Sequence, residues 1–153
     1  MTKEVKNVKM SNIQMRYDII KKLNYELKDE NLNNKKLTPK VDISVTQNFQ
    51  PKEKEYFGTI GLNIKFHLKE SKKIVLKLEL ETEAGFYGNP KIKENEFKEL
   101  VIKSGIMSLL QISRAKIISI SANFGFVPPI YLPMLNINEL VEKELEKAKI
   151  SAK

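Results

Sequence analysis

The sequence predicts an α+β fold in which a four-stranded antiparallel sheet is covered by two main helices. Two observations support this class. Alternating apolar and polar residues run through the segments before residue 90, and apolar residues at helical spacing run through the segments after it. Strands first and helices afterwards is the order typical of α+β proteins. A proline-rich connector, residues 125–136, is expected to cross over between the two helices.

Two of the strands are predicted to form a hairpin. Apolar side chains alternate with polar ones in residues 59–68, and the alternation returns in residues 74–81 after the polar turn 69–73. A turn of this length is ordinary for a hairpin. Residues 41–49 alternate in the same way and follow Pro39, which a strand tolerates near its beginning. They form the predicted third strand.

The first strand is specified less clearly, because residues 11–27 allow three interpretations. Their apolar residues share odd positions: Ile13, Met15, Tyr17, Ile19, Leu23, Tyr25 and Leu27. This parity favours either one long strand with a bulge or two short strands. A partly helical segment through Ile13, Tyr17 and Ile20 is the rival interpretation.

The second half of the chain is predicted to be helical up to the connector. A short helix over 94–103 is expected to stop at Ser104-Gly105, and a long helix over 106–124 to follow it. We expect Gly125 to close the long helix as a left-handed cap. Arg114 lies near the apolar stripe and is expected to need a buried partner or a subunit contact. The predicted stripe consists of Met107, Leu110, Ile117 and Ile120.

A terminal helix is predicted after the connector. Residues 136–139, Asn-Ile-Asn-Glu, resemble a capping box at its start. One apolar stripe follows at helical spacing, and the opposite face is charged. The stripe consists of Ile137, Leu140, Val141, Leu145 and Ala148.

The connector is apolar enough for a core but carries Pro128, Pro129 and Pro133. Because proline lacks an N–H and fixes φ, no helix interior or central strand accepts this run. Such a segment either packs over the sheet as a structural crossover or binds a partner. Binding is favoured because large apolar groups suit adaptable contact with extended peptides. With Phe49, the candidate client-binding residues are Phe124, Phe126, Ile130, Tyr131, Leu132, Met134 and Leu135.

Length and composition indicate the number of domains and the cellular compartment to expect. The 153 residues are expected to form a single domain, 1–153, with flexible ends at 1–10 and 150–153. The absence of cysteine fits a reducing compartment, so we expect a cytoplasmic protein. No apolar run is long enough to cross a bilayer, and the amino terminus lacks the apolar core of a signal peptide. Neither membrane insertion nor export of the chain itself is expected.

The net charge of +8 comes almost entirely from lysine, since Arg16 and Arg114 are the only arginines. Nucleic-acid-binding proteins typically use arginines, which form two parallel hydrogen bonds to phosphate or guanine, and aromatic residues interleaved with basic ones. Neither pattern occurs in this sequence. A lysine-rich solvated surface is the favoured interpretation. No specific nucleic-acid partner is therefore expected.

Catalytic chemistry has little support in the sequence. The one histidine, His67, cannot build a Ser/His/Asp triad or a two-histidine metal site. The glycines of residues 58–61 precede a strand rather than a helix, so they cannot place a phosphate at a helix amino terminus. We expect no enzyme activity, no metal site and no cofactor. Three acids recur at every second residue on one strand face: Glu79, Glu81 and Glu83. They are interpreted either as solvated residues or as a docking surface for a basic partner.

Two segments resemble the SecB family of protein-export chaperones. Residues 128–141, Pro-Pro-Ile-Tyr-Leu-Pro-Met-Leu-Asn-Ile-Asn-Glu-Leu-Val, look like that family's proline-rich crossover running into its last helix. Residues 38–45, Thr-Pro-Lys-Val-Asp-Ile-Ser-Val, are similar to its proline and alternating strand. Length, strand count and helix order agree over nearly the whole chain. The chain departs from the family in being basic, in having Met134 where another proline is frequent, and in one extra residue before the first proline.

The resemblance implies a homotetramer, a dimer of dimers, that acts as an ATP-independent holdase. Such a protein holds unfolded preproteins in long apolar grooves and delivers them to the translocase motor SecA. The resemblance also places Glu79 and Glu81 on the strand whose acidic surface contacts that motor, although Lys77 interrupts the patch.

Two alternatives stay open. A SecB-like chaperone dedicated to one client, such as an antitoxin or a phage protein, is suggested by the basic charge and the interrupted acidic strand. The other is a lysine-rich nucleic-acid-binding module, whose affinity would fall steeply with salt.

Overall fold

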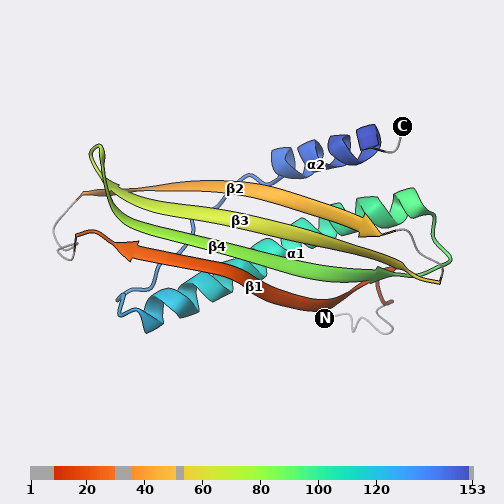
Figure 1. The fold of residues 1–153 in the computed structure, drawn as a ribbon, viewed down its shortest axis with the longest axis horizontal. Coiled ribbons are helices and arrows are strands. Elements are labelled where there is room, and N and C mark those ends of the chain that lie inside the picture. The colour runs from red at the N-terminus through yellow and green to blue at the C-terminus, as the bar shows by residue number, and fades with distance from the viewer. Residues whose placement is uncertain (1–8, 30–35, 51–53, 152–153) are drawn as a thin grey trace, which may run out of the picture.

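The computed structural model describes residues 9–29, 36–50 and 54–151, and it confirms the predicted α+β class. The four strands form one open antiparallel sheet in the order β1-β4-β3-β2, and two helices follow in the chain (Figure 1). The expected flexible ends, 1–10 and 150–153, fall largely outside the described residues. The elements are β1 (Ile13–Leu27), β2 (Leu37–Gln50), β3 (Tyr56–Glu70), β4 (Lys73–Gly88), α1 (Glu94–Asn123) and α2 (Asn138–Ser151).

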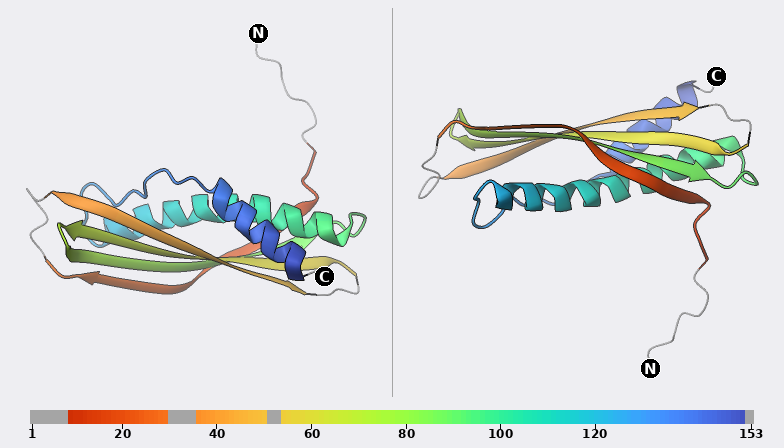
Figure 2. Two further views of the ribbon diagram at one scale, coloured as in Figure 1. Left: turned by 90° about the horizontal axis from the view of Figure 1, so that it is seen from above. Right: turned by 60° about the horizontal axis from the view of Figure 1, so that its bottom comes forward.

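Helices cover one face of the sheet and leave the other open. α1 packs against β3 and β4, and Figure 2 shows it running along one side of the sheet. The face beneath α1 carries the apolar residues that the alternation predicts, and Ile60, Leu62 and Ile64 are each at most 1% exposed. Asn63 and Lys65 point to the open face, because successive residues of a strand alternate between faces. The hydrophobic core therefore lies between α1 and the sheet.

β1 is one continuous strand with two irregularities, so the helical and two-strand interpretations of residues 11–27 are wrong. Its register against β4 shifts between Met15 and Tyr17 and again between Ile20 and Lys22. Each shift places one extra residue in β1. The side chains between the two shifts therefore change face, and the odd positions do not all share one side.

Two neighbouring residues show this change of face directly. The ring of Tyr17 covers Gly85 on the open face, where an added Cβ would lie 2.2 Å from a ring atom. The next residue, Asp18, instead accepts a hydrogen bond from the amine of Lys116 in α1, with 2.6 Å between Oδ1 and Nζ. The first bulge thus brings a carboxylate to the helix side of the sheet.

α1 is a single helix of 30 residues, so the predicted break at Ser104-Gly105 is wrong. A Cβ at Gly105 would lie 3.2 Å from side-chain atoms of Ile60 and Phe86, so the helix approaches the sheet closely at this glycine. It belongs to a buried row at every fourth residue, which is inclined to the helix axis and follows the twisted sheet. The row is Phe97, Val101, Gly105, Leu109, Ser113, Ile117 and Ser121.

The continuous helix also changes which residues its apolar stripe contains. Met107 is 54% exposed, whereas its neighbour Ile106 is fully buried. The prediction included Met107 in the stripe because it lies three residues before Leu110, but the buried side of the helix does not include it.

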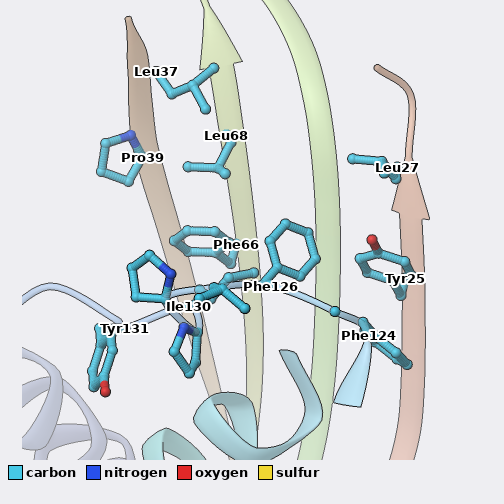
Figure 3. Close-up of a pocket in the computed structure, with 14 residues that line it drawn as sticks. Tyr25, Leu27, Leu37, Pro39, Phe66, Leu68, Phe124, Phe126, Ile130 and Tyr131 are labelled. Atoms are coloured by element: carbon cyan, nitrogen blue, oxygen red, sulfur yellow. The ribbon is translucent and has the colours of Figure 1, made fainter. Parts of the chain in front are cut away.

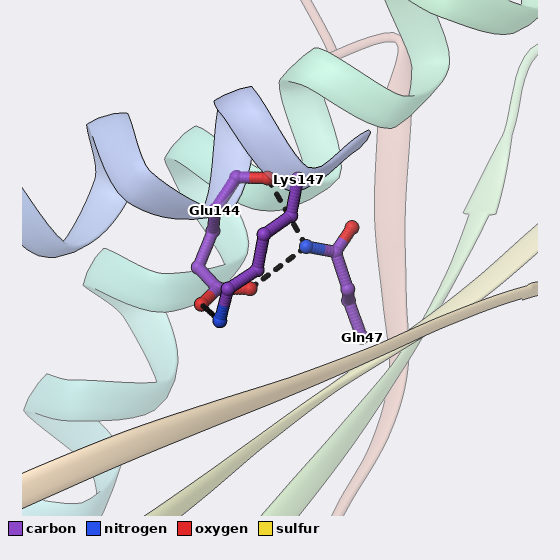
Figure 4. Close-up of polar contacts among 3 residues, drawn as sticks. All are labelled: Gln47, Glu144 and Lys147. Carbon is purple, nitrogen blue, oxygen red and sulfur yellow. Dashed lines mark hydrogen bonds and ion pairs between the residues drawn. The ribbon is translucent and has the colours of Figure 1, made fainter. Parts of the chain in front are cut away.

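α2 begins where the capping signal predicts, at Asn138, whose N–H donates to Oδ1 of Asn136 over 3.2 Å. Its predicted apolar stripe packs against the core. On the same side Glu144 is only 3% exposed. The Gln47 amide of β2 donates to the Oε2 of Glu144 at 2.7 Å and to its backbone oxygen at 3.1 Å, and Lys147 reaches Oε1 at 2.8 Å (Figure 4). The two bonds from Gln47 attach α2 to β2.

Candidate functional site

An open apolar pocket lies on the helix-side face of the sheet, at the end where β1 finishes and β2 begins (Figure 3). Its volume is about 630 Å³, within the range of roughly 300–1,000 Å³ that is typical of ligand pockets. Three strands form its floor and the connector forms a wall. The lining consists of Tyr25, Leu27, Leu37, Pro39, Phe66, Leu68 and residues 124–131.

The pocket exists because α1 stops before this end of the sheet. Just after the helix, Gly125 takes a φ of +93°, a conformation that glycine adopts without steric cost. Its N–H donates to the oxygen of Ala122, and the N–H of Phe126 donates to the oxygen of Ser121, each over 3.1 Å. This is the Schellman pattern of a helix end, so the predicted cap at Gly125 is confirmed. Beyond it the chain leaves the sheet face uncovered.

The connector is attached to α1 at two points. The buried N–H of Ile130 donates to the Oγ of Ser121 over 2.8 Å. Further along, the Nη2 of Arg114 donates to the backbone oxygen of Pro133 over 2.6 Å. Arg114 thus has a partner within its own chain, but at an exposed position and not the buried partner that was expected. Ile130 at the first point and Leu132, just before the second, are each 8% exposed and belong to the core.

Aromatic rings form the wall of the pocket nearest β1. The rings of Tyr25 and Phe124 lie with their centroids 4.3 Å apart, and Phe126 meets Tyr25 edge-on at 6.2 Å. Burial raises the pKa of the Tyr25 hydroxyl above its ordinary value of 10.0. Phe124 is 43% exposed and Val127 is 95% exposed, so the pocket offers apolar surface to a partner.

The structure brings together only part of the predicted client-binding set. Leu132 is buried within its own chain, whereas Met134 is 88% exposed. Phe49 lies near the other end of the sheet, where its ring packs edge-on against Phe97 at 6.1 Å. Four predicted residues line the pocket: Phe124, Phe126, Ile130 and Tyr131. Four others do not line it: Phe49, Leu132, Met134 and Leu135.

The sequence interpretation missed the strand side of the pocket. Alternation identifies these residues as apolar strand positions, but it does not say which part of the sheet a helix leaves uncovered. One signal was available in the sequence, because Leu27 and Leu37 flank the polar and charged residues 28–36, which suit a connection at one end of the sheet. The missed residues are Tyr25, Leu27, Leu37, Pro39, Phe66 and Leu68.

The acids of β4 lie on the open face, away from the pocket, and two of them are paired. Glu79 accepts a hydrogen bond from Asn63 at 3.1 Å and contacts Lys22 at 3.2 Å. These two contacts hold the pKa of the Glu79 carboxyl below its ordinary value of 4.5. Glu83 pairs in the same way with Lys21 at 3.1 Å. Lysines of β1 therefore neutralise much of the ladder formed by Glu79, Glu81 and Glu83.

Metal and membrane sites were sought in the part of the chain that the structure describes. No group of three or more His, Cys, Asp or Glu residues there is placed to hold a metal ion. Of the two helices described, neither is long and apolar enough to cross a membrane.

No model of a known protein family matches the chain, and no curated protein matches its sequence. Among solved structures it is similar to Rv1957, a SecB-like chaperone of Mycobacterium tuberculosis in complex with a ChAD peptide from the HigA1 antitoxin Rv1956. The TM-score is 0.67 with 14% identity, over 82% of this chain and 91% of that one. A protein of unknown function from Streptococcus agalactiae matches with a TM-score of 0.47 and 12% identity, over 80% of this chain and 97% of that one. The chain therefore has the SecB-like fold that its sequence resemblance predicts.

Proposed function

We propose that this protein is a molecular chaperone that holds an extended, unfolded polypeptide segment in the pocket. The observation that carries the proposal is the pocket itself, which is open to solvent and, among the residues that the structure describes, is lined by no charged side chain. Apolar contacts of this kind accept many side chains and need no nucleotide. Several such pockets in one assembly would gain avidity through effective concentration. The protein would then act as a holdase and not as an enzyme, because no bond is made or broken.

Of the two forms of this function, we favour a chaperone dedicated to one client. The similar structure of Rv1957 contains a peptide from an antitoxin, which is the kind of client this form requires. In this chain two acids of the β4 ladder are already paired with lysines of β1, so the ladder offers little free negative charge to a motor protein. Recovery of one stoichiometric client by pull-down from the native cell would support this form.

The second form is a general holdase that passes unfolded preproteins to SecA. Its support is the shared position of Glu79, Glu81 and Glu83 on one uncovered sheet face. A heterogeneous set of precursor clients in the same pull-down, together with measurable binding of SecA, would favour it over the dedicated form.

We further propose a cytoplasmic homotetramer built as a dimer of dimers. The edge strand β1 exposes three large apolar residues, Ile19, Ile20 and Leu23, each by 39–45%, and α1 exposes Met107. Exposed apolar side chains along an edge strand and its covering helix are favourably buried against another subunit. The lack of cysteine suits a reducing compartment. Light scattering should give the mass of four chains, and a monomer at every concentration would contradict the assembly.

The experiment that tests the chaperone function is protection of a chemically denatured client from aggregation, without ATP. Phe124→Asp and Val127→Asp each place a charge in the pocket lining at a side chain that is already exposed. Both variants should protect less than the native protein while keeping its circular dichroism spectrum. Met10→Asp is the matched control, because Met10 is 80% exposed and lies outside the lining. Full protection by both pocket variants would overturn the proposal.

A nucleic-acid-binding module remains the rival class. Binding of an oligonucleotide through lysines would weaken steeply as salt is added, whereas apolar client binding would not. Strong oligonucleotide binding at physiological salt, with no protection of the denatured client, would favour the rival.

A further inference from the structure

Three aromatic rings and an arginine lie together on the face of the sheet that carries no helix (Figure 2). Phe57 of β3 and Tyr87 of β4 are register partners, and their ring centroids are 5.0 Å apart. The guanidinium carbon of Arg16 in β1 lies 5.1 Å from the centroid of the Tyr87 ring. In the neighbouring row of the sheet, the ring of Tyr17 crosses Gly85. We call Arg16, Tyr17, Phe57 and Tyr87 the aromatic platform.

The contacts of neighbouring residues confirm the face on which the platform lies. Phe86 is only 3% exposed in the core, and a Cβ at Gly88 would collide with the ring of Phe97 in α1. Because successive strand residues point to opposite faces, Tyr87 between them points away from α1. Arg16 is exposed and the three rings are half-buried, so the platform presents aromatic surface to solvent.

The charge around the platform is mainly positive. Glu83, at the near end of the β4 ladder, accepts a hydrogen bond from the Tyr17 hydroxyl at 3.0 Å and pairs with Lys21 at 3.1 Å. Three basic residues at this end of the sheet, by contrast, form no ion pair within the part of the chain that the structure describes. They are Arg16, Lys54 just before β3, and Lys91 just after β4.

A small polar hollow adjoins the platform where the strands end. Its volume is about 210 Å³, and Arg16 and Tyr87 form part of its lining. Most of the other polar side chains there are amides and a hydroxyl, which both donate and accept hydrogen bonds. These are Ser11, Asn12, Gln14 and Asn89, with Glu55 as the carboxylate. Two exposed amides of β2, Asn48 and Gln50, follow on the same face as register partners of Thr59 and Phe57.

This combination of groups suits a single-stranded nucleic acid. Aromatic side chains stack on unpaired bases with little regard to sequence, because every base has a flat π-face. An arginine that lies over a ring can still direct its N–H groups to a phosphate. Amides that donate and accept can bond the 2′-hydroxyl, which distinguishes RNA from DNA. Four-stranded sheets with aromatic residues on the open face are one of the recurring ways of binding RNA.

We infer that the aromatic platform binds single-stranded RNA at a site separate from the client pocket. Bases stack on Tyr17 and Phe57, and Arg16 contacts a phosphate. No stretch of the sequence interleaves aromatic and basic residues, but the sheet brings them together from three strands. An apolar polypeptide would cover the rings and leave the unpaired basic groups without a partner, whereas RNA supplies a phosphate at every nucleotide. The inference goes beyond the proposed chaperone function and does not depend on it.

Fluorescence anisotropy with a labelled single-stranded RNA of about ten nucleotides tests the inference on the native protein. The RNA should bind at low salt, and its affinity should fall as salt is added. Arg16→Gln should weaken binding and reduce the slope of log affinity against log salt by about 0.7, the value for one phosphate contact on a single strand. Lys65→Gln is the matched control, because Lys65 is an exposed cation of the same face outside the platform. It should leave the slope unchanged.

Removal of a ring tests the stacking. Tyr17→Thr and Phe57→Thr each keep a residue that favours strands, and each should weaken RNA binding about tenfold. His67→Thr removes a ring from the same face outside the platform and should leave the affinity unchanged. Phe57→Leu keeps apolar volume at the position, so it provides a second variant if the threonine variants do not fold. It should weaken binding as well, because it lacks the ring.

Further outcomes separate this inference from the proposed function and from other polyanions. The pocket variant Phe124→Asp should bind RNA normally, and Phe57→Thr should still protect a denatured client. Duplex RNA should bind more weakly because its bases are already stacked in pairs, and single-stranded DNA of the same sequence should bind more weakly because it lacks the 2′-hydroxyl.

Four results would overturn the inference. These are no binding of the RNA at low salt, full affinity in both ring variants, loss of RNA binding in Phe124→Asp, and equally tight binding of duplex RNA, single-stranded DNA or an unfolded Glu-rich peptide. The last result would identify a general surface for anionic partners. Loss of client protection in the native protein would overturn the proposed function and leave this inference standing.

Discussion

Ser121, in the last turn of α1, accepts a hydrogen bond through its Oγ from the backbone N–H of Ile130, over 2.8 Å. Both residues are buried, at 1% and 8% exposure. The hydroxyl also donates to the backbone oxygen of Ile118 over 3.1 Å, so it is used as donor and acceptor. The bond between Ser121 and Ile130 is the point at which the connector, after forming the pocket wall, returns to the helix.

Ser121→Ala should therefore destabilise the protein. The substitution leaves the buried N–H of Ile130 without its acceptor, which costs about 1–3 kcal/mol. Urea denaturation measures this change in the free energy of unfolding. Ser119→Ala, at an exposed position of the same helix, should change it by no more than about 0.5 kcal/mol. Equal stability of the two variants would show that the Ser121 bond does not hold the connector.

Gly105→Val tests the close approach of α1 to the sheet. A Cβ at this position already lies 3.2 Å from Ile60 and Phe86, so a larger side chain has to push the helix away. We expect a loss of about 1–3 kcal/mol in the free energy of unfolding, as is usual for overpacked cores. Ser104→Val places the same side chain on the exposed face of the helix and controls for helix propensity. Equal stability of the two variants would show that Gly105 is not tightly packed against the sheet.

Glu144→Ala should loosen α2 from the sheet. The substitution removes the carboxylate that accepts from the Gln47 amide at 2.7 Å, and hydrogen bonds to charged groups contribute about 1.5–3 kcal/mol. Because α2 is a peripheral element, we expect faster hydrogen exchange of its amides before any change in β3 and β4. Glu146→Ala, at an exposed position of α2, should leave the exchange rates unchanged. Unchanged protection of α2 in Glu144→Ala would contradict the assigned role.

His67 makes the stability of the protein depend on pH in a defined direction. Its pKa in the folded state lies below 6.5, so the unfolded chain binds the proton more readily. The contribution of His67 to stability is therefore complete above pH 6.5 and is lost as the pH falls from 6.5 towards the folded pKa. NMR titration measures this pKa without overlap, because the chain has one histidine.

Lys77→Gln provides the control for this titration. It removes a cation that lowers the pKa of His67, so the pKa should rise in the variant. A native pKa at or above 6.5 would contradict the lowering assigned to burial and to Lys77.

The sequence by itself determined the class of fold and the order of its elements. Alternation in β2, β3 and β4 depends on local residue choice, because one face must be apolar and the other polar. The cap at Gly125 and the start of α2 near Asn136 are local as well, since both rest on backbone groups within one helical turn. The connector was recognisable because three prolines exclude a regular element.

Only the tertiary structure decided where the pocket lies and which residues belong to it. Its floor joins Tyr25, Pro39 and Phe66 from three strands, and its extent depends on where α1 ends above them. The bulges of β1 and the role of Gly105 are equally non-local, because each depends on a partner far away in the chain. Phe49 is a further example. Its apolar character was evident from the sequence, but only the packing of the folded chain places its ring against Phe97 and away from the pocket. Residue type thus specifies local structure, whereas the uncovered part of a sheet follows from the length and direction of the helix that covers the rest.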